Sequence, residues 1–315
     1  MLSRTADGLF WLARYTERAE NVARILSAGH RMAGLTQSLG SPGNEWHSTL
    51  LAAGCADAYF RKYDEATPEG VVDFLVRDPD NPSSILSCLD TARRNARSVR
   101  IALTIDMWET LNDTWLELRR RDVSGIAAEQ LIGLLDWVKH RSMLFHGCCA
   151  NTMLRNDAFY FAQLGTYLER ADNTARILDF KYHVLLPRED PVGGAVDYSH
   201  WESILRAVSA LRAYHLLYHE RLSPWLIADL LILRPEMPRS LAACYREVAG
   251  YLEALAQGPE KRRGDCHRRA GEVHARLRSG RIDTIFQAGL HEFLTELIDE
   301  SHALSREIGD LYLLA

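Results

Sequence analysis

The residues whose side chains are best suited to binding or catalysis are two Glu-Arg pairs, Glu17-Arg18 and Glu169-Arg170, which stand 152 positions apart in the chain. A carboxylate accepts protons and hydrogen bonds, and a guanidinium offers a planar fork of N–H donors that fits carboxylate or phosphate oxygens. Such a set can bind an anionic ligand, with the glutamates holding an amine or acting as bases. The same set can instead form buried ion pairs that hold two helices together.

The segments around the two pairs are near copies of each other. Residues 12–26 (LARYTERAENVARIL) align with residues 164–178 (LGTYLERADNTARIL), and ten of the fifteen positions are identical. The polar positions that recur are Glu17, Arg18, Asn21 and Arg24, and in the second segment Glu169, Arg170, Asn173 and Arg176. Surface substitutions usually change stability by less than about 0.5 kcal/mol, so a merely solvated face would not need to keep these residue types. We therefore predict that the eight residues meet a ligand, a partner protein or each other; a plain solvated face is the remaining alternative.

These residues must be positioned by helices, because both segments carry apolar residues at three- and four-residue spacing. An apolar stripe runs along one side of the first helix from Leu12 to Leu26. Glu17, Asn21 and Arg24 fall on the opposite side. The pattern predicts one face packed in a core and a second, polar face whose groups either form buried ion pairs with another helix or line a ligand pocket.

Two further pairs of segments match in the same order along the chain. Residues 46–63 resemble residues 201–218, and residues 81–88 resemble residues 237–244. Matches that keep their order and spacing are typical of an internal duplication.

The rest of the chain also reads as helix after helix, because two-residue alternation is hard to find. Pro and Gly clusters interrupt the pattern, for example at residues 78–82, 187–194 and 234–235. The sequence predicts an all-α protein, a duplicated helical bundle of about a dozen helices. Its two quasi-equivalent halves, residues 1–150 and 155–315, are expected to pack as one compact body.

Composition limits the classes of function. A chain of 315 residues with 47% hydrophobic residues can bury a large core, and 37 basic against 42 acidic residues give a net charge of −5. This balance gives no reason to expect binding to nucleic acid or to anionic lipid. The apolar run at residues 9–13 is too short for a signal peptide, and no stretch reaches the roughly 18 apolar residues of a membrane span. We expect a cytoplasmic protein with six free, mostly buried cysteines.

Other candidate sites are weaker. Glu109 lies between Trp108 and Asn112 on one predicted helical turn, so its carboxylate and the amide can face a common groove. His215 and His219 have the spacing of a metal-binding pair but lack the acid of a zinc protease motif. The chain has no phosphate-binding Gly-rich loop, no GxSxG elbow and no paired CxxC set. We therefore predict no metal and no cofactor, and assign no catalytic residue.

Several blocks resemble the Alpha-E family, which is named for its helical fold and its Glu-Arg motif. They stand at residues 1–21, 81–85, 92–97, 108–112 and 168–172. The chain departs from the family pattern at Arg94, where a glutamate is expected, so a site that borrows a carboxylate there is in doubt for this protein.

The resemblance implies partners more than chemistry. Members of that family are typically encoded beside, or fused to, a circularly permuted ATP-grasp protein that resembles carboxylate-amine ligases, often with a transglutaminase-like cysteine peptidase nearby. The first expectation is an accessory or co-catalytic subunit that binds this ligase or its peptide substrate. One alternative is a stand-alone enzyme that acts on an amide or amino-acid substrate in a pocket between the halves. Another is a helical scaffold or homodimer.

Overall fold

The computed structural model describes residues 1–38, 44–121, 126, 128–185, 195–258 and 262–313, and these residues contain helices and no strand. The helices are α1 (Ser3–Ser38), α2 (Glu45–Ala52), α3 (Ala56–Phe60), α4 (Pro68–Val76), α5 (Ile85–Ser98), η1 (Arg100–Ala102, a 3₁₀ helix), α6 (Ile105–Arg120), α7 (Ala128–Thr152), α8 (Asp157–Leu185), α9 (Ala195–Ala207), α10 (Leu211–Tyr218), α11 (Pro224–Ile232), α12 (Leu241–Ala256), α13 (Asp265–Ser279), α14 (Ile282–Ala288) and α15 (Leu290–Tyr312). The all-α prediction is confirmed.

The described α-helices number fifteen, more than the predicted dozen. The difference comes from short elements such as α3, α10 and α14, which have only five to eight residues. So few residues hold about two helical turns or less, which is too short for a repeating apolar pattern to be read. The predicted breaks at 78–82 and 234–235 do lie between helices, whereas 187–194 lies outside the described residues.

Side-chain hydroxyl groups cap the N-termini of several helices. Ser84 Oγ accepts a hydrogen bond from the backbone N–H of Ser87 at 3.2 Å, where α5 begins. Ser240 Oγ accepts from the backbone N–H of Ala243 at 3.0 Å, where α12 begins. Each cap satisfies an N–H that has no partner inside its own helix, and such caps typically stabilise a helix by about 1 kcal/mol.

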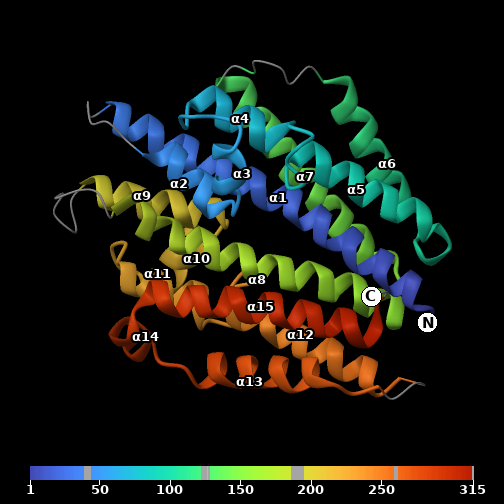
Figure 1. Ribbon diagram of the computed structural model, residues 1–315. Helices are drawn as coiled ribbons and strands as arrows, with labels where there is room; N and C mark the ends of the chain where they lie inside the picture. The colour runs from blue at the N-terminus through green and yellow to red at the C-terminus, as the bar shows by residue number, and fades with distance from the viewer. Residues whose placement is uncertain (39–43, 122–125, 127, 186–194, 259–261, 314–315) are drawn as a thin grey trace.

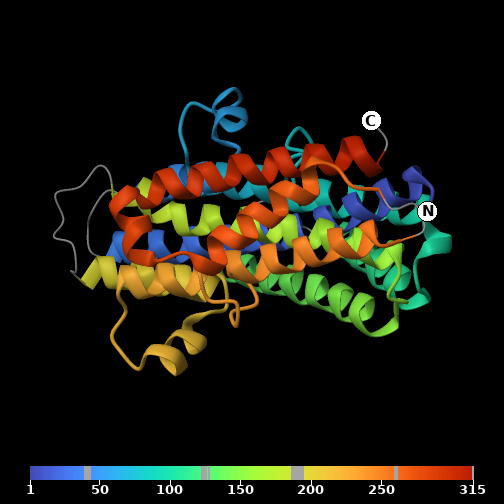
Figure 2. The same ribbon diagram turned by 90° about the horizontal axis from the view of Figure 1, so that it is seen from below.

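Two long helices form the centre of the molecule. In Figure 1, α1 and α8 run side by side through the middle, with α2 to α7 largely above them and α11 to α15 below. The contact between α1 and α8 is more extensive than that between any other two described helices. α1 also packs against α5, α7 and α9. Figure 2 shows the long helices running along one common direction, with the short α10 at the periphery.

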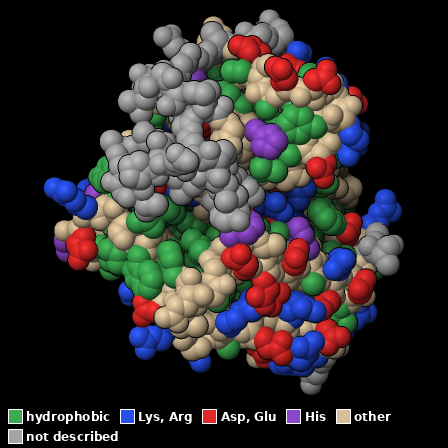
Figure 3. Space-filling model, turned by 60° about the vertical axis from the view of Figure 1, so that its left-hand side comes forward, with side chains coloured by type: hydrophobic (Ala, Val, Ile, Leu, Met, Phe, Trp, Pro, Cys, Tyr) green, Lys and Arg blue, Asp and Glu red, His purple; other side chains and the backbone are tan. Residues whose placement is uncertain are grey.

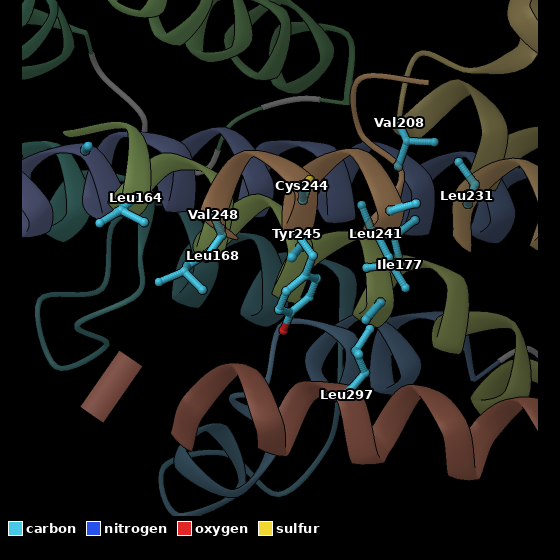
Figure 4. Close-up of a cluster of buried hydrophobic side chains, with 14 of the residues drawn as sticks. Leu164, Leu168, Ile177, Val208, Leu231, Leu241, Cys244, Tyr245, Val248 and Leu297 are labelled. Atoms are coloured by element: carbon cyan, nitrogen blue, oxygen red, sulfur yellow. The ribbon is translucent and has the colours of Figure 1, made fainter. Parts of the chain in front are cut away.

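Two hydrophobic cores flank this central pair. The larger one joins α8 to α12 and α15, and Figure 4 shows Leu164 and Leu168 of α8 beside Val248 of α12, with Leu297 of α15 farther along the cluster, below Ile177. These four side chains are almost completely buried. The smaller core fills the space between α1, α4, α5 and α7.

The predicted polar face of α1 is not a surface. Glu17, Asn21 and Arg24 are 0%, 4% and 2% exposed, as deeply buried as the apolar stripe on the other side. This burial agrees with the alternative in which the polar residues meet other helices, because α8 covers this side of α1 and α5, α7 and α9 cover the others.

Gly165 allows α1 and α8 to approach closely, because a Cβ at this position would lie 2.2 Å from the carbonyl oxygen of Phe10. We expect Gly165→Ala to lower the free energy of unfolding by about 1–3 kcal/mol, since the helix backbones must separate. Gly250→Ala is the matched control, because no atom lies within 4 Å of its Cβ position and alanine favours a helix by up to about 1 kcal/mol. Urea unfolding measures both. Equal or higher stability of Gly165→Ala would show that the close approach has no cost.

The surface is mixed in charge. On the face drawn in Figure 3, acidic and basic side chains alternate over the lower part, and hydrophobic side chains gather on the left. Among the helices of the described ranges, none combines the length and the apolar character needed to cross a membrane.

Candidate functional site

The two Glu-Arg pairs face each other between α1 and α8 and bind reciprocally. Arg170 donates from Nε to Glu17 Oε1 at 3.1 Å and from Nη2 to Oε2 at 2.8 Å. Arg18 donates in the same way to Glu169, from Nε to Oε1 at 2.5 Å and from Nη2 to Oε2 at 3.0 Å. Each guanidinium therefore holds the carboxylate of the other helix through two parallel hydrogen bonds, a strong and geometrically specific arrangement.

A second guanidinium binds each of these glutamates. Arg239, which immediately precedes the capping residue of α12, donates from Nη1 to Glu17 Oε1 at 3.0 Å and also binds Glu20. Arg14 of α1 donates from Nε to Glu169 Oε2 at 2.7 Å. The two glutamates are thus equally well neutralised, although the second arginine comes from a different element in each case.

Arg24 and Arg176 do not reach the central glutamates. Arg24 donates from Nε to Glu20 at 2.8 Å, and Arg176 donates from Nε to Asp172 at 2.7 Å, so each binds the acid one turn before it in its own helix. Arg24 also reaches out of α1, because its Nη1 donates to the carbonyl oxygen of Ala207 at 2.5 Å. These flanking pairs extend the charged cluster along both helices.

The two asparagines differ in their hydrogen bonds. Asn21 donates from Nδ2 to the backbone carbonyl of Glu169 at 3.2 Å, which links the two helices once more. Asn173 is 3% exposed, and its Nδ2 donates to no residue that the structure describes. The Oδ1 atoms of both asparagines are buried without a partner, so the two residues differ only in the amide N–H groups.

Burial and ion pairing act in opposite directions on the pKa values of the cluster. Burial alone would raise the pKa of Glu17 and of Glu169, but the arginines on each carboxylate outweigh it and hold both pKa values below the ordinary range. Burial alone would lower the pKa of Arg18 and Arg170, and the facing glutamates raise it instead. All four groups therefore stay charged at neutral pH, and the glutamates are poor proton acceptors.

One group of side chains in the cluster has the spacing of a metal site. Acceptor atoms of Glu17, Glu20 and His146 lie within 4.8 Å of one another, and His146 Nε2 is 2.9 Å from Glu17 Oε2. The carboxylates already bind arginines, however, and Arg239 bridges Glu17 and Glu20. A metal ion there would have to displace a guanidinium that is itself buried, so the residues present do not fit a metal.

The cysteines are free, as predicted, and the two beside the cluster do not have the character of nucleophiles. Cys88 and Cys244 lie close enough to Arg18 and Arg170 to feel their charge, but burial dominates and raises the pKa of both thiols to about 12. A thiol with so high a pKa stays protonated at neutral pH, and the thiolate is the reactive form.

A cavity of about 150 Å³ opens beside the cluster, on the Glu169 side. Of the predicted residues, it is lined by Arg18, Asn21, Glu169, Asn173 and Arg176. Its remaining polar lining is Arg14, Ser83, Asp172 and His302, with the backbone of Gly54 at one wall. A space of this size holds several water molecules or a small ion, and it is smaller than the sites that take drug-sized ligands.

The other candidates lie outside the cluster. Glu109 is exposed on α6 and has no hydrogen bond or ion pair within the described part of the chain, and Asn112 accepts a hydrogen bond from Arg93 Nε at 3.0 Å. His215 and His219, in and just after α10, are both exposed. The structure does not bring any of these residues to the Glu-Arg cluster.

Sequence reasoning missed several members of the cluster, namely Arg14, Glu20, His146, Asp172, Arg239 and His302. Glu20 and Asp172 stand at matching positions and are both acidic, so a comparison by charge instead of identity would have found them. Arg239 lies 222 residues from Glu17, and no local pattern marks it.

The comparisons with known proteins agree with this architecture. An uncharacterized protein of Mycobacterium bovis and two uncharacterized proteins of Mycobacterium tuberculosis are each 24% identical to the chain over 335 residues. The alignments cover 98% of this chain but only 36% of each relative, so the chain spans about a third of their length. No solved structure matches it significantly. Residues 1–313 match Alpha-E, a predicted alpha-helical domain with a conserved ER motif, and the chain belongs to this family.

Proposed function

We propose that this chain is a helical accessory subunit of an ATP-grasp peptide or amide ligase system, which it serves by binding the ligase. The observation that supports this proposal is that the glutamates of the Glu-Arg cluster are bound by arginines. Glu17 and Glu169 are each held by two arginines, so neither is available as a base. The motif then acts as the rigid centre of a binding protein.

The internal duplication is part of this proposal. The reciprocal pairs Glu17–Arg170 and Glu169–Arg18 relate the two Glu-Arg helices as equivalent partners. We infer two repeated halves, residues 1–150 and 155–315, joined through these helices into one body. A body built in this way presents its outer helices, and not its centre, to a partner.

The greater length of the relatives supports the proposal that this chain acts together with a partner protein. Nearly the whole chain aligns with about a third of each mycobacterial protein. In those proteins this helical domain is therefore covalently joined to a much longer polypeptide. A domain that occurs within longer proteins is well suited to act next to another domain.

The docking surface we propose is an apolar groove at the end of the bundle near the N-terminus. The groove has a volume of about 660 Å³ and is lined by residues of η1 and of the segment between α7 and α8, including Ile101, Leu103, Met153 and Leu154. Ile101 is completely exposed, and Leu154 is 75% exposed. Large exposed apolar side chains that cluster together are typical of protein interfaces.

The charges around the groove favour an acidic partner surface. Arg97, Arg100 and Arg155 are exposed and flank the apolar residues in the sequence, and they outnumber the two acids of the same stretches, Asp106 and Asp157. An apolar centre with a charged rim is the usual anatomy of an interface, and the rim selects the partner and speeds association. The ligase surface that binds here is expected to combine apolar side chains with Asp and Glu.

Replacement of Ile101 or Leu154 by aspartate should weaken binding of the ATP-grasp ligase at least tenfold, which corresponds to about 1.4 kcal/mol. The test is co-purification of the full chain with the circularly permuted ATP-grasp protein of the same organism, followed by calorimetry on the pure pair. Ligation activity is then measured with and without the chain.

Leu216→Asp is the matched control, because Leu216 is an exposed leucine on α10, at the other end of the bundle (Figure 1). It should bind the ligase as the unchanged chain does. A ligase that is fully active and does not bind this chain would contradict the accessory role. Equal loss of binding in all three variants would contradict the groove as the docking surface.

A further inference from the structure

We propose that the cavity beside Arg18 and Arg176 is a binding site for a small oxyanion, a carboxylate or a phosphate. The proposal does not depend on the accessory role. It follows from a comparison of the surroundings of Arg24 with those of Arg176. The two arginines stand at matching positions, but different side chains surround them.

The first difference concerns the flanking arginines. Arg24 Nη1 donates to Ser209 Oγ at 3.1 Å as well as to the carbonyl oxygen of Ala207. Arg176 stands 152 positions after Arg24, and at its side Gly54 takes the place of Ser209. Both Gly54 and Ser209 have a left-handed backbone, with φ of 67° and 59°, so the turns correspond and only the side chain is missing.

The missing side chain leaves a donor of Arg176 unused. A Cβ on Gly54 would lie 2.9 Å from Arg176 Nη1, so this nitrogen sits directly against the wall that the glycine forms. Nε and Nη2 of Arg176 bind Asp172, whereas Nη1 has no hydrogen bond to any described residue. Arg18 has the same pattern, with Nε and Nη2 on Glu169.

The second difference concerns the arginine that bridges two acids. Arg239 fills the space next to Glu17 and Glu20 with its guanidinium. In the matching segments, Ser83 stands where Arg239 stands, and Ser83 lines the cavity. The space beside Arg24 is therefore filled by protein side chains. The matching space beside Arg176 stays open, because Gly54 and Ser83 are too small to fill it.

A buried amide points to the same ligand. Asn173 lines the cavity and is 3% exposed, and its Nδ2 donates to no described residue, whereas the matching Nδ2 of Asn21 donates to the carbonyl oxygen of Glu169. An amide N–H and the unused guanidinium N–H groups are all donors, and oxyanions are acceptors only. A bound oxyanion would accept the hydrogen bond that Asn173 Nδ2 does not make within the protein.

The charge balance also favours an anion. Arg14, Arg18 and Arg176 line the cavity together with the carboxylates of Glu169 and Asp172, which leaves one positive charge before His302 is counted. Every one of these carboxylates already binds at least one arginine. A cation would therefore meet excess positive charge, whereas an oxyanion would compensate it.

The test is calorimetric titration of the full chain with sodium acetate and, separately, with inorganic phosphate at constant ionic strength. We expect saturable binding of one of the two with one site per chain. Ser83→Arg should weaken this binding at least tenfold, because the new guanidinium fills the cavity as Arg239 fills the matching place. Asn173→Ala should also weaken it, since it removes the amide donor.

Ser279→Arg is the control for charge, because it adds the same side chain at an exposed position at the end of α13. It should leave binding unchanged, and circular dichroism should show that all variants keep their helix content. Preference for acetate would indicate a carboxylate ligand, and preference for phosphate a phosphorylated one. Absence of saturable binding of both ions, or unchanged binding in folded Ser83→Arg and Asn173→Ala, would overturn the proposal.

Discussion

Replacement of Glu17 by glutamine is expected to lower the free energy of unfolding by about 3–5 kcal/mol, the usual cost of removing one member of a buried ion pair. Glu17 is completely buried and holds Arg170 and Arg239, so Arg170 would lose its countercharge and Arg239 would keep only Glu20. The loss is a large fraction of the 5–15 kcal/mol that typically stabilises a domain. Urea or thermal unfolding followed by circular dichroism measures it directly.

Glu109→Gln serves as the matched control, because Glu109 is exposed on α6 and forms no ion pair with the described residues. Its stability should change by less than about 0.5 kcal/mol. Similar stabilities for the two variants would mean that the central carboxylates do not stabilise the fold. The role of the Glu-Arg motif would then have to be sought in ligand binding alone.

The protein should also lose stability steeply in acid. Four buried acids have pKa values held below the ordinary range, because arginines outweigh the effect of burial; these are Glu17, Glu20, Glu169 and Asp172. A carboxyl with a lowered pKa in the folded state binds protons more readily when unfolded. Its contribution is therefore fully present above about pH 4, the ordinary range for Asp and Glu, and is lost as pH falls through the folded-state pKa.

Each of these acids should contribute a slope of up to about 1.4 kcal/mol per pH unit between its unfolded and folded pKa values. Urea unfolding at pH 7, 5, 4 and 3.5 measures the combined slope. A Glu169→Gln variant should show a shallower dependence below pH 4, because one titrating group is removed. An unfolding free energy that is the same at pH 7 and pH 3.5 would contradict the ion-paired cluster.

The helical class was predictable from the sequence because long helices repeat their apolar pattern over many turns. α1 and α8 each exceed seven turns, whereas α3 and α14 are too short to repeat theirs. The importance of the recurring Glu, Arg and Asn residues was also predictable. Their burial was one of the alternatives left open, because the pattern of one helix does not show whether its polar face meets another helix or a ligand.

The pairing scheme was out of reach for a different reason. Glu17 binds Arg170 and Arg239, which lie 153 and 222 residues away. Periodicity reports which residues share a face of one helix, but it does not say which helix lies opposite or in what register. The contact of α1 with α8 brings Arg170 to Glu17, and the packing of α12 on α8 brings Arg239 there.

The reciprocal pairs also act as a lock against sliding. Each residue of an α-helix advances the chain by about 1.5 Å, so a displacement of α8 along α1 by one turn would carry Arg170 away from Glu17 and, in the same movement, Glu169 away from Arg18. Both carboxylates would lose the facing guanidinium at once, and Glu17 would do so in a completely buried position. We therefore expect any large rearrangement of this molecule to take place among the outer helices, while α1 and α8 keep their register.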